Sequence, residues 1–234
     1  STPVMEALRD ALDEAQRRGV KALAFASDKP RMFLAGAAVE EIAGITDPQR
    51  GAEKAAYGQA IFEAIAQFPR PTAAVITGPC LGGGYELALA CRWCIAENSD
   101  AVKVGLPEVR LGILPGFGGT QRLPRLIPLR VARELMFTGD WLSAKEAERW
   151  GIINKAVPRE KLREYVEGVA DKLVQRSPMA LKYTKYSINR GMQVDLYTGI
   201  EIEKAASRAH FQTQDAKEGL KSFQERRKPN FPGK

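Results

Sequence analysis

The sequence contains few of the residues on which several common catalytic and structural devices depend. Its 234 residues include one histidine, His210, and three cysteines. A single histidine leaves no Ser-His or Cys-His catalytic pair unless His210 itself takes part, and it lies far in sequence from every glycine-rich turn. Cys80, Cys91 and Cys94 are typical of a reducing environment and not of a disulfide scaffold.

Other absences narrow the class of protein further. Cys91-x-x-Cys94 taken alone could indicate a redox or zinc site, but the chain has no second such pair. We therefore interpret the cysteines as small buried thiols and predict no metal site. No apolar run approaches the length of a membrane span, and no segment resembles a signal peptide.

The composition that is present is ordinary for a globular protein that can bury a sizeable core, with 44% hydrophobic and 27% charged residues. The formal net charge is +7, and basic residues are enriched near the C-terminal end between Lys217 and Lys234. A solvated basic tail, a site for the phosphates of a bound molecule and a nucleic-acid surface all fit this charge. Charge alone does not separate the three.

The most informative stretch runs from Ala73 to Gly119. Its first half contains an apolar, β-rich segment that stops at Gly78-Pro79, a Gly82-Gly83-Gly84 turn, and the start of an apolar helix. Backbone N–H groups at such a turn can point at a ligand oxygen. Glu86 falls in the first turn of the predicted helix, where a carboxylate suits the helix dipole.

The second half of the stretch repeats this logic. VKVGL predicts a strand that ends at Pro107, Glu108 follows, and a glycine-rich loop leads into the next helix. Two carboxylates aimed into one cleft can divide the roles of acid and base. Either glutamate alone is typical of a dipole-favoured surface position. The triple glycine lacks the G-x-G-x-x-G spacing of a dinucleotide site.

The segments LGGGYELALAC and VGLPEVRLGILPGFGGTQRLPRL together resemble the crotonase (enoyl-CoA hydratase/isomerase) superfamily, in its hydratase branch. Phe33–Ala37 is similar to the family's F-x-A-G-A segment, and Phe223–Pro229 to its basic C-terminal end. The resemblance covers nearly the whole chain. It implies an α/β crotonase (ClpP/crotonase-like) fold, with a repeated ββα core at residues 1–172 and a helical trimerisation region at 173–234. We expect the family's first strands to be missing from this chain.

The resemblance also implies roles for individual residues. Glu86 and Glu108 match the family's catalytic acids, and the backbone N–H groups of Ala37 and Gly83 match its oxyanion hole. The remaining positions that match substrate- and CoA-binding residues are Ala35, Gly116, Phe223 and Arg226, the last two in relatives reaching across a subunit boundary. The family usually has Asp where this chain has Ala38, and often Lys in place of Arg226.

The implied reaction is reversible syn addition of water to a 2-enoyl-CoA, giving a 3-hydroxyacyl-CoA in fatty acid β-oxidation or related acyl-CoA degradation. Glu108 is expected to donate the proton to C2. No cofactor is expected, since coenzyme A is part of the substrate. The implied assembly is a homotrimer or a dimer of trimers, and the implied location is the cytoplasm, or the mitochondrial matrix in a eukaryote.

Retention of both acids favours a hydratase over the family's isomerases, dehalogenases and decarboxylases. An enoyl-CoA isomerase, or a hydratase of a branched, aromatic or dienoyl thioester, is the first alternative. A nucleic-acid-binding member of the fold would lose affinity steeply with added salt, unlike acyl-CoA turnover. A non-catalytic member would tolerate Gln at Glu86 and Glu108.

Hydrophobic spacing predicts an amphipathic helix at about residues 3–18 and a helix at 60–68, and residues 44–58 are interpreted as a mobile loop with a short helix. Ser143-Ala144-Lys145-Glu146 predicts a helix start through a capping box. The C-terminal part is predicted to be helical at about residues 159–175, 177–190, 197–212 and 215–226.

Overall fold

The computed structural model describes residues 2–30, 32–36 and 39–234 of the chain. The chain forms two compact units. The first unit comprises Ser1–Phe68 and Thr72–Glu167, and it contains both sheets. The second comprises Pro69–Pro71 and Gly168–Lys234, and within Gly168–Lys234 its secondary structure is helical. The assignment of residues 1–172 to an α/β core and of residues 173–234 to a helical trimerisation region stays a prediction.

The first sheet is wholly parallel, in the order β1-β3-β5-β8. Its strands are β1 (Leu23–Phe25), β3 (Thr72–Ile76), β5 (Trp93–Glu97) and β8 (Lys155–Val157). The central strands β3 and β5 are almost continuously buried, because a parallel sheet in an α/β unit is covered on both faces. This is why both read as short apolar runs instead of alternating ones.

The second sheet has the order β2-β4-β6-β7, and only its last pair is antiparallel. Its strands are β2 (Leu34–Ala35), β4 (Cys80–Leu81), β6 (Lys103–Gly105) and β7 (Trp141–Ser143). The chain passes from β1 to β2, from β3 to β4 and from β5 to β6, and each pair leads into a helical segment. The result is the repeated ββα core that the family resemblance implies.

This repetition positions the site. Because β2, β4 and β6 are parallel neighbours, their carboxyl ends meet at one edge of the second sheet. Gly36, Gly82 and Leu106 are the residues that follow these strands directly. The topology therefore brings three segments to the same edge of the second sheet: the turn at Gly36, the turn at Gly82, and the segment after β6 that carries Glu108.

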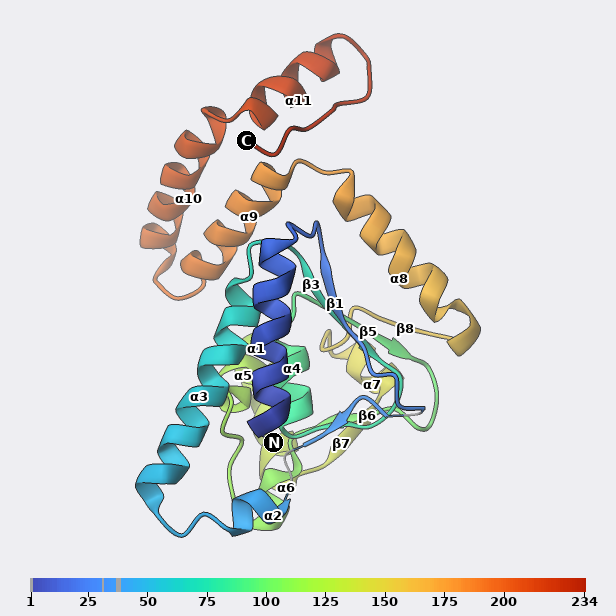
Figure 1. Ribbon diagram of the computed structural model, residues 1–234, viewed down its shortest axis with the longest axis vertical. Helices are drawn as coiled ribbons and strands as arrows, with labels where there is room; N and C mark the ends of the chain where they lie inside the picture. The colour runs from blue at the N-terminus through green and yellow to red at the C-terminus, as the bar shows by residue number, and fades with distance from the viewer. Residues whose placement is uncertain (1, 31, 37–38) are drawn as a thin grey trace. The chain divides into compact units, whose positions relative to one another are not determined.

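Helices cover the sheets of the first unit. Helix α1 (Thr2–Arg17) packs against α3 (Pro48–Gln67), which packs in turn against α4 (Gly83–Ala90), as Figure 1 shows. Tyr85 and Phe62 are among the largest fully buried side chains. The remaining helical segments of this unit are α2 (Val39–Ala43), η1 (Pro107–Leu111, a 3₁₀ helix), α5 (Gly119–Leu126), α6 (Leu129–Thr138), α7 (Ala144–Arg149) and the first part of α8 (Arg159–Val174).

The interpretation of residues 44–58 as a mobile loop with a short helix is wrong. Helix α3 begins at Pro48 and continues without a break to Gln67. Asp47 is its N-cap and accepts a hydrogen bond from the Gln49 N–H at 2.9 Å, and Pro48 occupies the first helical turn. The cap and the proline together start the helix earlier than the hydrophobic spacing indicates.

Other predicted elements are confirmed. The helix expected at residues 3–18 is α1, and the capping box at Ser143 and Glu146 is present at the start of α7. The four C-terminal helices lie close to the expected ranges, as α8, α9 (Pro178–Gly191), α10 (Leu196–Phe211) and α11 (Gln214–Gln224). None of the helices within the described ranges combines the length and apolar character needed to cross a bilayer.

The second unit has a buried polar anchor and an exposed apolar surface. Asp215 is buried, and its carboxylate accepts hydrogen bonds from the Ser177 hydroxyl at 2.6 Å and the Gly233 N–H at 2.7 Å. These bonds tie α11 to the start of α9 and to the chain's last residues, and they hold the pKa of Asp215 below its usual value despite burial. The exposed apolar side chains include Tyr186, Ile188, Tyr197, Ile200, Phe211 and Phe223.

Candidate active site

An open cleft of about 1460 Å³ lies in the first unit, where the glycine turns meet α3. It is bounded by the ends of β2 and β4, by the N-terminus of α4, by η1 and the loop that follows it, and by the N-terminal half of α3. The predicted site residues among its lining are Ala35, Gly83, Glu86, Glu108 and Gly116.

Glu86 occupies the first turn of α4, with only 1% of the residue exposed. Its Oε1 accepts hydrogen bonds from the backbone N–H groups of Phe117 and Gly119, both at 2.8 Å. Gly119 is the first residue of α5, so this oxygen lies at the positive end of a second helix. Oε2 lies 3.9 Å from the position of a Cβ on Gly83, which places it at the turn that lines the cleft.

Glu108 lies in the first turn of η1 and is 9% exposed. Its Oε2 is buried without a hydrogen-bond partner among the described residues. Its Oε1 faces Gly82, where an added Cβ would come within 2.9 Å of it. Glu108 therefore has a poorer set of donors than Glu86, although both acids line one cleft.

These surroundings affect the two acids differently. Burial raises the pKa of Glu86, but the N–H groups of Gly119 and Phe117, and the charge of Arg122, oppose that shift. Burial raises the pKa of Glu108 to about 7, a hydrogen bond from its own backbone N–H opposes the shift, and the nearby Glu86 charge adds to it. Near neutral pH, Glu108 is thus poised between its acid and carboxylate forms.

The turn before α4 requires glycine at Gly82 because of its backbone conformation, and at Gly84 because the backbone of β2 lies so close. Gly82 is the N-cap of α4 and has φ +55°, a conformation that side chains rarely adopt. A Cβ on Gly84 would overlap the carbonyl oxygen of Leu34 in β2. The turn therefore places the N-terminus of α4, with the N–H group of its first residue Gly83, at the edge of the cleft.

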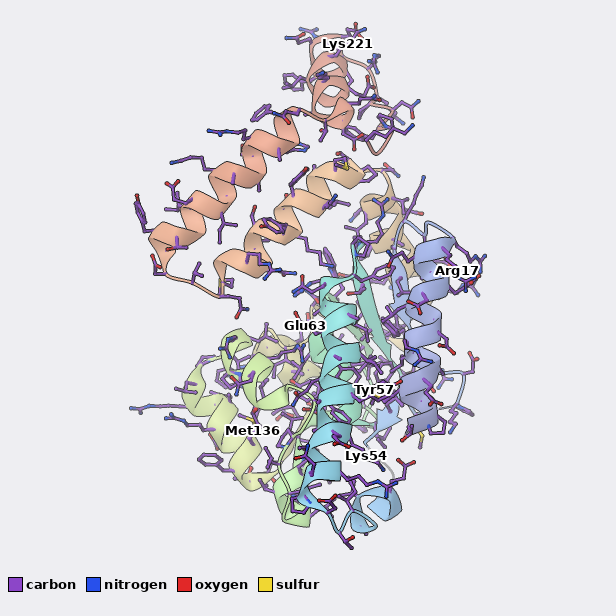
Figure 2. The ribbon with its side chains drawn as sticks, turned by 60° about the vertical axis from the view of Figure 1, so that its left-hand side comes forward. Arg17, Lys54, Tyr57, Glu63, Met136 and Lys221 are labelled. Atoms are coloured by element: carbon purple, nitrogen blue, oxygen red, sulfur yellow. The ribbon has the colours of Figure 1, made fainter. Side chains whose placement is uncertain are left out.

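The second glycine turn is held by contacts on both sides. The Gln59 side-chain amide in α3 donates to the Gly116 carbonyl at 2.9 Å. Arg122 in α5 donates to the Phe117 carbonyl at 3.0 Å, and its other terminal nitrogen forms an ion pair with Glu63 of α3, also at 3.0 Å. Figure 2 labels Glu63 on this helix. These bonds fix the backbone that donates to Glu86.

Three predicted positions cannot be grouped with the cleft. Ala37, the second expected oxyanion donor, lies outside the described residues. Phe223 and Arg226 belong to the second unit, where Phe223 is 85% exposed. Their predicted contact with substrate stays a prediction. Arg226 is also the one non-glycine residue in the described part of the chain with positive φ, at 52°.

The site residues predicted from the sequence do not include Phe117, Gln59 or Arg122. Phe117 stands between two glycines, Gly116 and Gly118, which is a visible sign that its backbone is held in an unusual path. Gln59 and Arg122 carry no such sign, because a polar residue in a helix is usually only a solvated one. Their partners lie far away in sequence, so their roles emerge only in the folded chain.

The three cysteines do not line the cleft. Cys80, Cys91 and Cys94 are buried free thiols, and burial raises the pKa of Cys94 to about 12. Across the residues described, no group of three or more His, Cys, Asp or Glu side chains is arranged to hold a metal ion.

Comparisons with known proteins agree with this geometry. Residues 1–234 match the family described as enoyl-CoA hydratase/isomerase. The crotonyl-CoA hydratase of Syntrophomonas wolfei is 40% identical over 215 residues, or 92% of this chain and 82% of that protein. The short-chain-enoyl-CoA hydratase of Clostridium acetobutylicum is 38% identical over 198 residues, or 85% of this chain and 75% of that protein. A crystal structure of enoyl-CoA hydratase from Bacillus anthracis aligns with TM-score 0.93 at 37% identity, covering 100% of this chain and 90% of that one.

Proposed function

The chain belongs to the enoyl-CoA hydratase/isomerase family, and we propose that it catalyses the reversible addition of water to a 2-enoyl-CoA thioester. One observation carries this proposal. Two buried carboxylates, Glu86 and Glu108, line one cleft beside a glycine turn, and their surroundings give them unequal acidity. An acid and a base held in one site are what hydration of a polarised double bond requires.

The thioester oxygen would bind at the N-terminus of α4. The Gly83 N–H is directed to this end of the helix, where the helix dipole also favours negative charge. We assign the second donor to the N–H of Ala37. As the double bond is attacked, charge moves onto the thioester oxygen, and one such donor typically contributes about 3–4 kcal/mol to the transition state.

We assign the base to Glu86 and the acid to Glu108. Two backbone donors on Oε1 favour the carboxylate form of Glu86, which leaves Oε2 to accept a proton from water. The water oxygen bonds to C3, the C2–C3 π electrons move toward the thioester, and the protonated Glu108 delivers a proton to C2. The Gly116 backbone is assigned a contact near this water. Dehydration follows the same steps in reverse.

No cofactor enters this proposal, because coenzyme A is part of the substrate. We further propose that the second unit forms the subunit contacts of a homotrimer or a dimer of trimers. The exposed apolar side chains of α9, α10 and α11 support this, since surfaces of this kind usually mark interfaces. Phe223 and Arg226 would then contact the CoA bound by a neighbouring subunit. A cytoplasmic or matrix location stays a prediction.

The direct test is the loss of ultraviolet absorbance of crotonyl-CoA as its conjugated thioester is hydrated. We expect turnover by the unmodified protein and its loss in Glu86→Gln and in Glu108→Gln. Product analysis by nuclear magnetic resonance must show a 3-hydroxyacyl group, because a shifted double bond would indicate isomerisation. A folded protein that binds acyl-CoA but neither hydrates nor dehydrates it would contradict the proposal.

A further inference from the structure

Two cationic side chains of α3, Arg50 and Lys54, line the cleft beyond the acids. Their four-residue spacing places them on the same face of the helix. Lys54 is half-buried, whereas Arg50 is exposed. Figure 2 shows Lys54 on the same helix as Tyr57 and Glu63, toward its N-terminal end.

Neither cation has an anionic partner in the part of the chain that the structure describes. The other two acids that line the cleft, Glu41 and Glu53, already accept hydrogen bonds. Glu53 accepts from the Gln49 side chain at 3.3 Å, and Glu41 accepts from the Thr2 backbone N–H at 3.4 Å. A cation without a partner at the lining of a cleft attracts an anionic ligand into it.

The position of Lys54 relative to the reacting atoms follows from contacts around Phe117. A Cβ on Gly58 of α3 would lie 2.5 Å from one edge of the Phe117 ring, and a Cβ on Gly83 would lie 3.3 Å from the opposite edge. Helix α3 is therefore separated from the proposed thioester donor by the width of the ring. Lys54 precedes Gly58 by one helical turn, or about 6 Å along the axis.

Part of the cleft lining suits an acyl chain. It consists of apolar and small residues from the end of η1 and the loop after it, and from the segment that leads into α3 and its first turns, namely Ile45, Ala52, Ala55, Leu111, Ile113 and Leu114. An acyl chain leaving C3 away from Gly83 would pass along these side chains. Its far end would arrive where Lys54 enters the cleft.

We propose that Lys54, with Arg50 beside it, binds a carboxylate at the far end of the acyl chain, so that the preferred substrates are ω-carboxy 2-enoyl-CoA thioesters. This inference rests on the proposed hydratase function and names its substrate class. A methyl-terminated chain would leave the ammonium without a partner, whereas a carboxylate would form a charge-assisted hydrogen bond with it.

Matched thioesters test this substrate class. Turnover is compared on trans-2-hexenoyl-CoA and on its ω-carboxy analogue, trans-2-hexenedioyl-CoA, for the unmodified protein, Lys54→Met and Arg50→Met. Methionine keeps the apolar stem of the side chain and removes the charge. Lys145→Met is the control, since Lys145 is exposed on α7 and does not line the cleft.

We expect the unmodified protein to prefer the ω-carboxy substrate in kcat/KM by about 10- to 100-fold, the range that a charge-assisted hydrogen bond provides. Lys54→Met should abolish this preference and leave kcat/KM for hexenoyl-CoA within about twofold. Arg50→Met should reduce the preference by a smaller factor, and Lys145→Met should retain it. No preference in the unmodified protein, or a preference that survives Lys54→Met, would overturn the proposal.

Two further arms separate this proposal from other outcomes. Equal losses on both CoA substrates that disappear with N-acetylcysteamine thioesters, which carry no phosphates, would assign Lys54 to the CoA phosphates and overturn the proposal. Calorimetric binding of adipyl-CoA and hexanoyl-CoA tests the same preference without turnover. Tighter binding of adipyl-CoA that Lys54→Met abolishes would support the subsite even if hydration itself failed. Equal binding of the two would refute it.

Discussion

The two acids of the cleft lie in regions that treat a carboxylate in different ways. Around Glu86 the chain supplies two backbone N–H groups, the N-terminus of α5 and a nearby guanidinium. Around Glu108 it supplies burial and leaves Oε2 without a partner among the described residues. The same fold repeat therefore delivers two glutamates to one place and gives them unequal tendencies to hold a proton.

In the proposed mechanism, this difference would let one residue type serve as both base and acid. Hydrogen bonds to a carboxylate favour its charged form, and burial without donors favours its neutral form. Since both are glutamates, the division of roles must come from the backbone and side chains around them. Arg122 is central to this, because it contacts the carbonyl of Phe117, whose N–H donates to Glu86.

Replacing either acid should have the largest effect. Glu86→Gln and Glu108→Gln are each expected to lower kcat for hydration by about a thousandfold or more, because each loses a proton-transfer step and disturbs the held water. Stopped-flow absorbance with crotonyl-CoA measures the rates. Near-normal binding of butyryl-CoA is the control for a preserved cleft. A decrease in kcat smaller than about tenfold in either variant would contradict the assignment of Glu86 as base and Glu108 as acid.

The pH dependence of kcat/KM should be the same in the two directions of reaction. Hydration uses ionised Glu86 with protonated Glu108, and dehydration of 3-hydroxybutyryl-CoA uses the same singly protonated pair with the proton on the other acid. Because the reaction takes up no net proton, kcat/KM should fall about tenfold per pH unit above about pH 7 in both directions. The fall on the acid side, where Glu86 becomes protonated, is assigned to Glu86. Both falls report apparent values of the coupled pair, and a kcat/KM for hydration that stays constant between about pH 7 and about pH 9 would contradict the role of Glu108 as acid.

Removing Arg122 should weaken the distinction between the acids. We expect Arg122→Gln to lower kcat by about tenfold, because the backbone that donates to Glu86 loses its clamp. Arg122 also lowers the pKa of Glu86, so the acid limb should move to higher pH, which a purely structural role would not produce. Arg125→Gln, which removes an exposed arginine bonded to Gln121 of its own helix, is the matched control and should change neither quantity.

Stability should show the smallest effect. Burial raises the pKa of Glu108 in the folded chain to about 7 from an unfolded value near 4.5, so its contribution is most favourable below about pH 4.5 and is lost as pH rises through about 7. Glu108→Gln should therefore raise the free energy of unfolding by ~1–2 kcal/mol at pH 8, with little change at pH 4. Glu86→Gln should gain less, since it weakens two donor contacts. Urea unfolding at both pH values checks the order.

The positions of the two acids could be predicted from the sequence, whereas their unequal surroundings could not. Glycine turns beside Glu86 and Glu108 are local signals that survive without a structure. The donors to Glu86 come from Phe117 and Gly119, more than 30 residues further along the chain by their numbering, and no local pattern indicates that pairing. The ion pair of Arg122 with Glu63 could not be predicted either, because these residues are also far apart in the sequence.

Strand prediction had a similar limit. The two-residue strand β4 has too few residues to show any periodicity, and it is defined by its pairing with β2 and β6. Helix α3 is a different case. Asp47-Pro48 is a recognisable N-terminal signal for a helix, so the start of α3 could be predicted from the sequence, although residues 44–58 are interpreted there as a mobile loop with a short helix. Lys54 was indistinguishable in sequence from a solvated helix residue, and only the fold places it in the cleft.

The most direct test of the central claim is deuterium exchange at C2 of butyryl-CoA in D₂O, followed by nuclear magnetic resonance. Butyryl-CoA has no hydroxyl to eliminate, so exchange reports only on proton transfer at C2. If Glu108 handles that proton while Glu86 handles water, exchange should continue in Glu86→Gln at a rate near that of the unmodified protein and stop in Glu108→Gln. Exchange that survives in Glu108→Gln and disappears in Glu86→Gln would contradict the assignment.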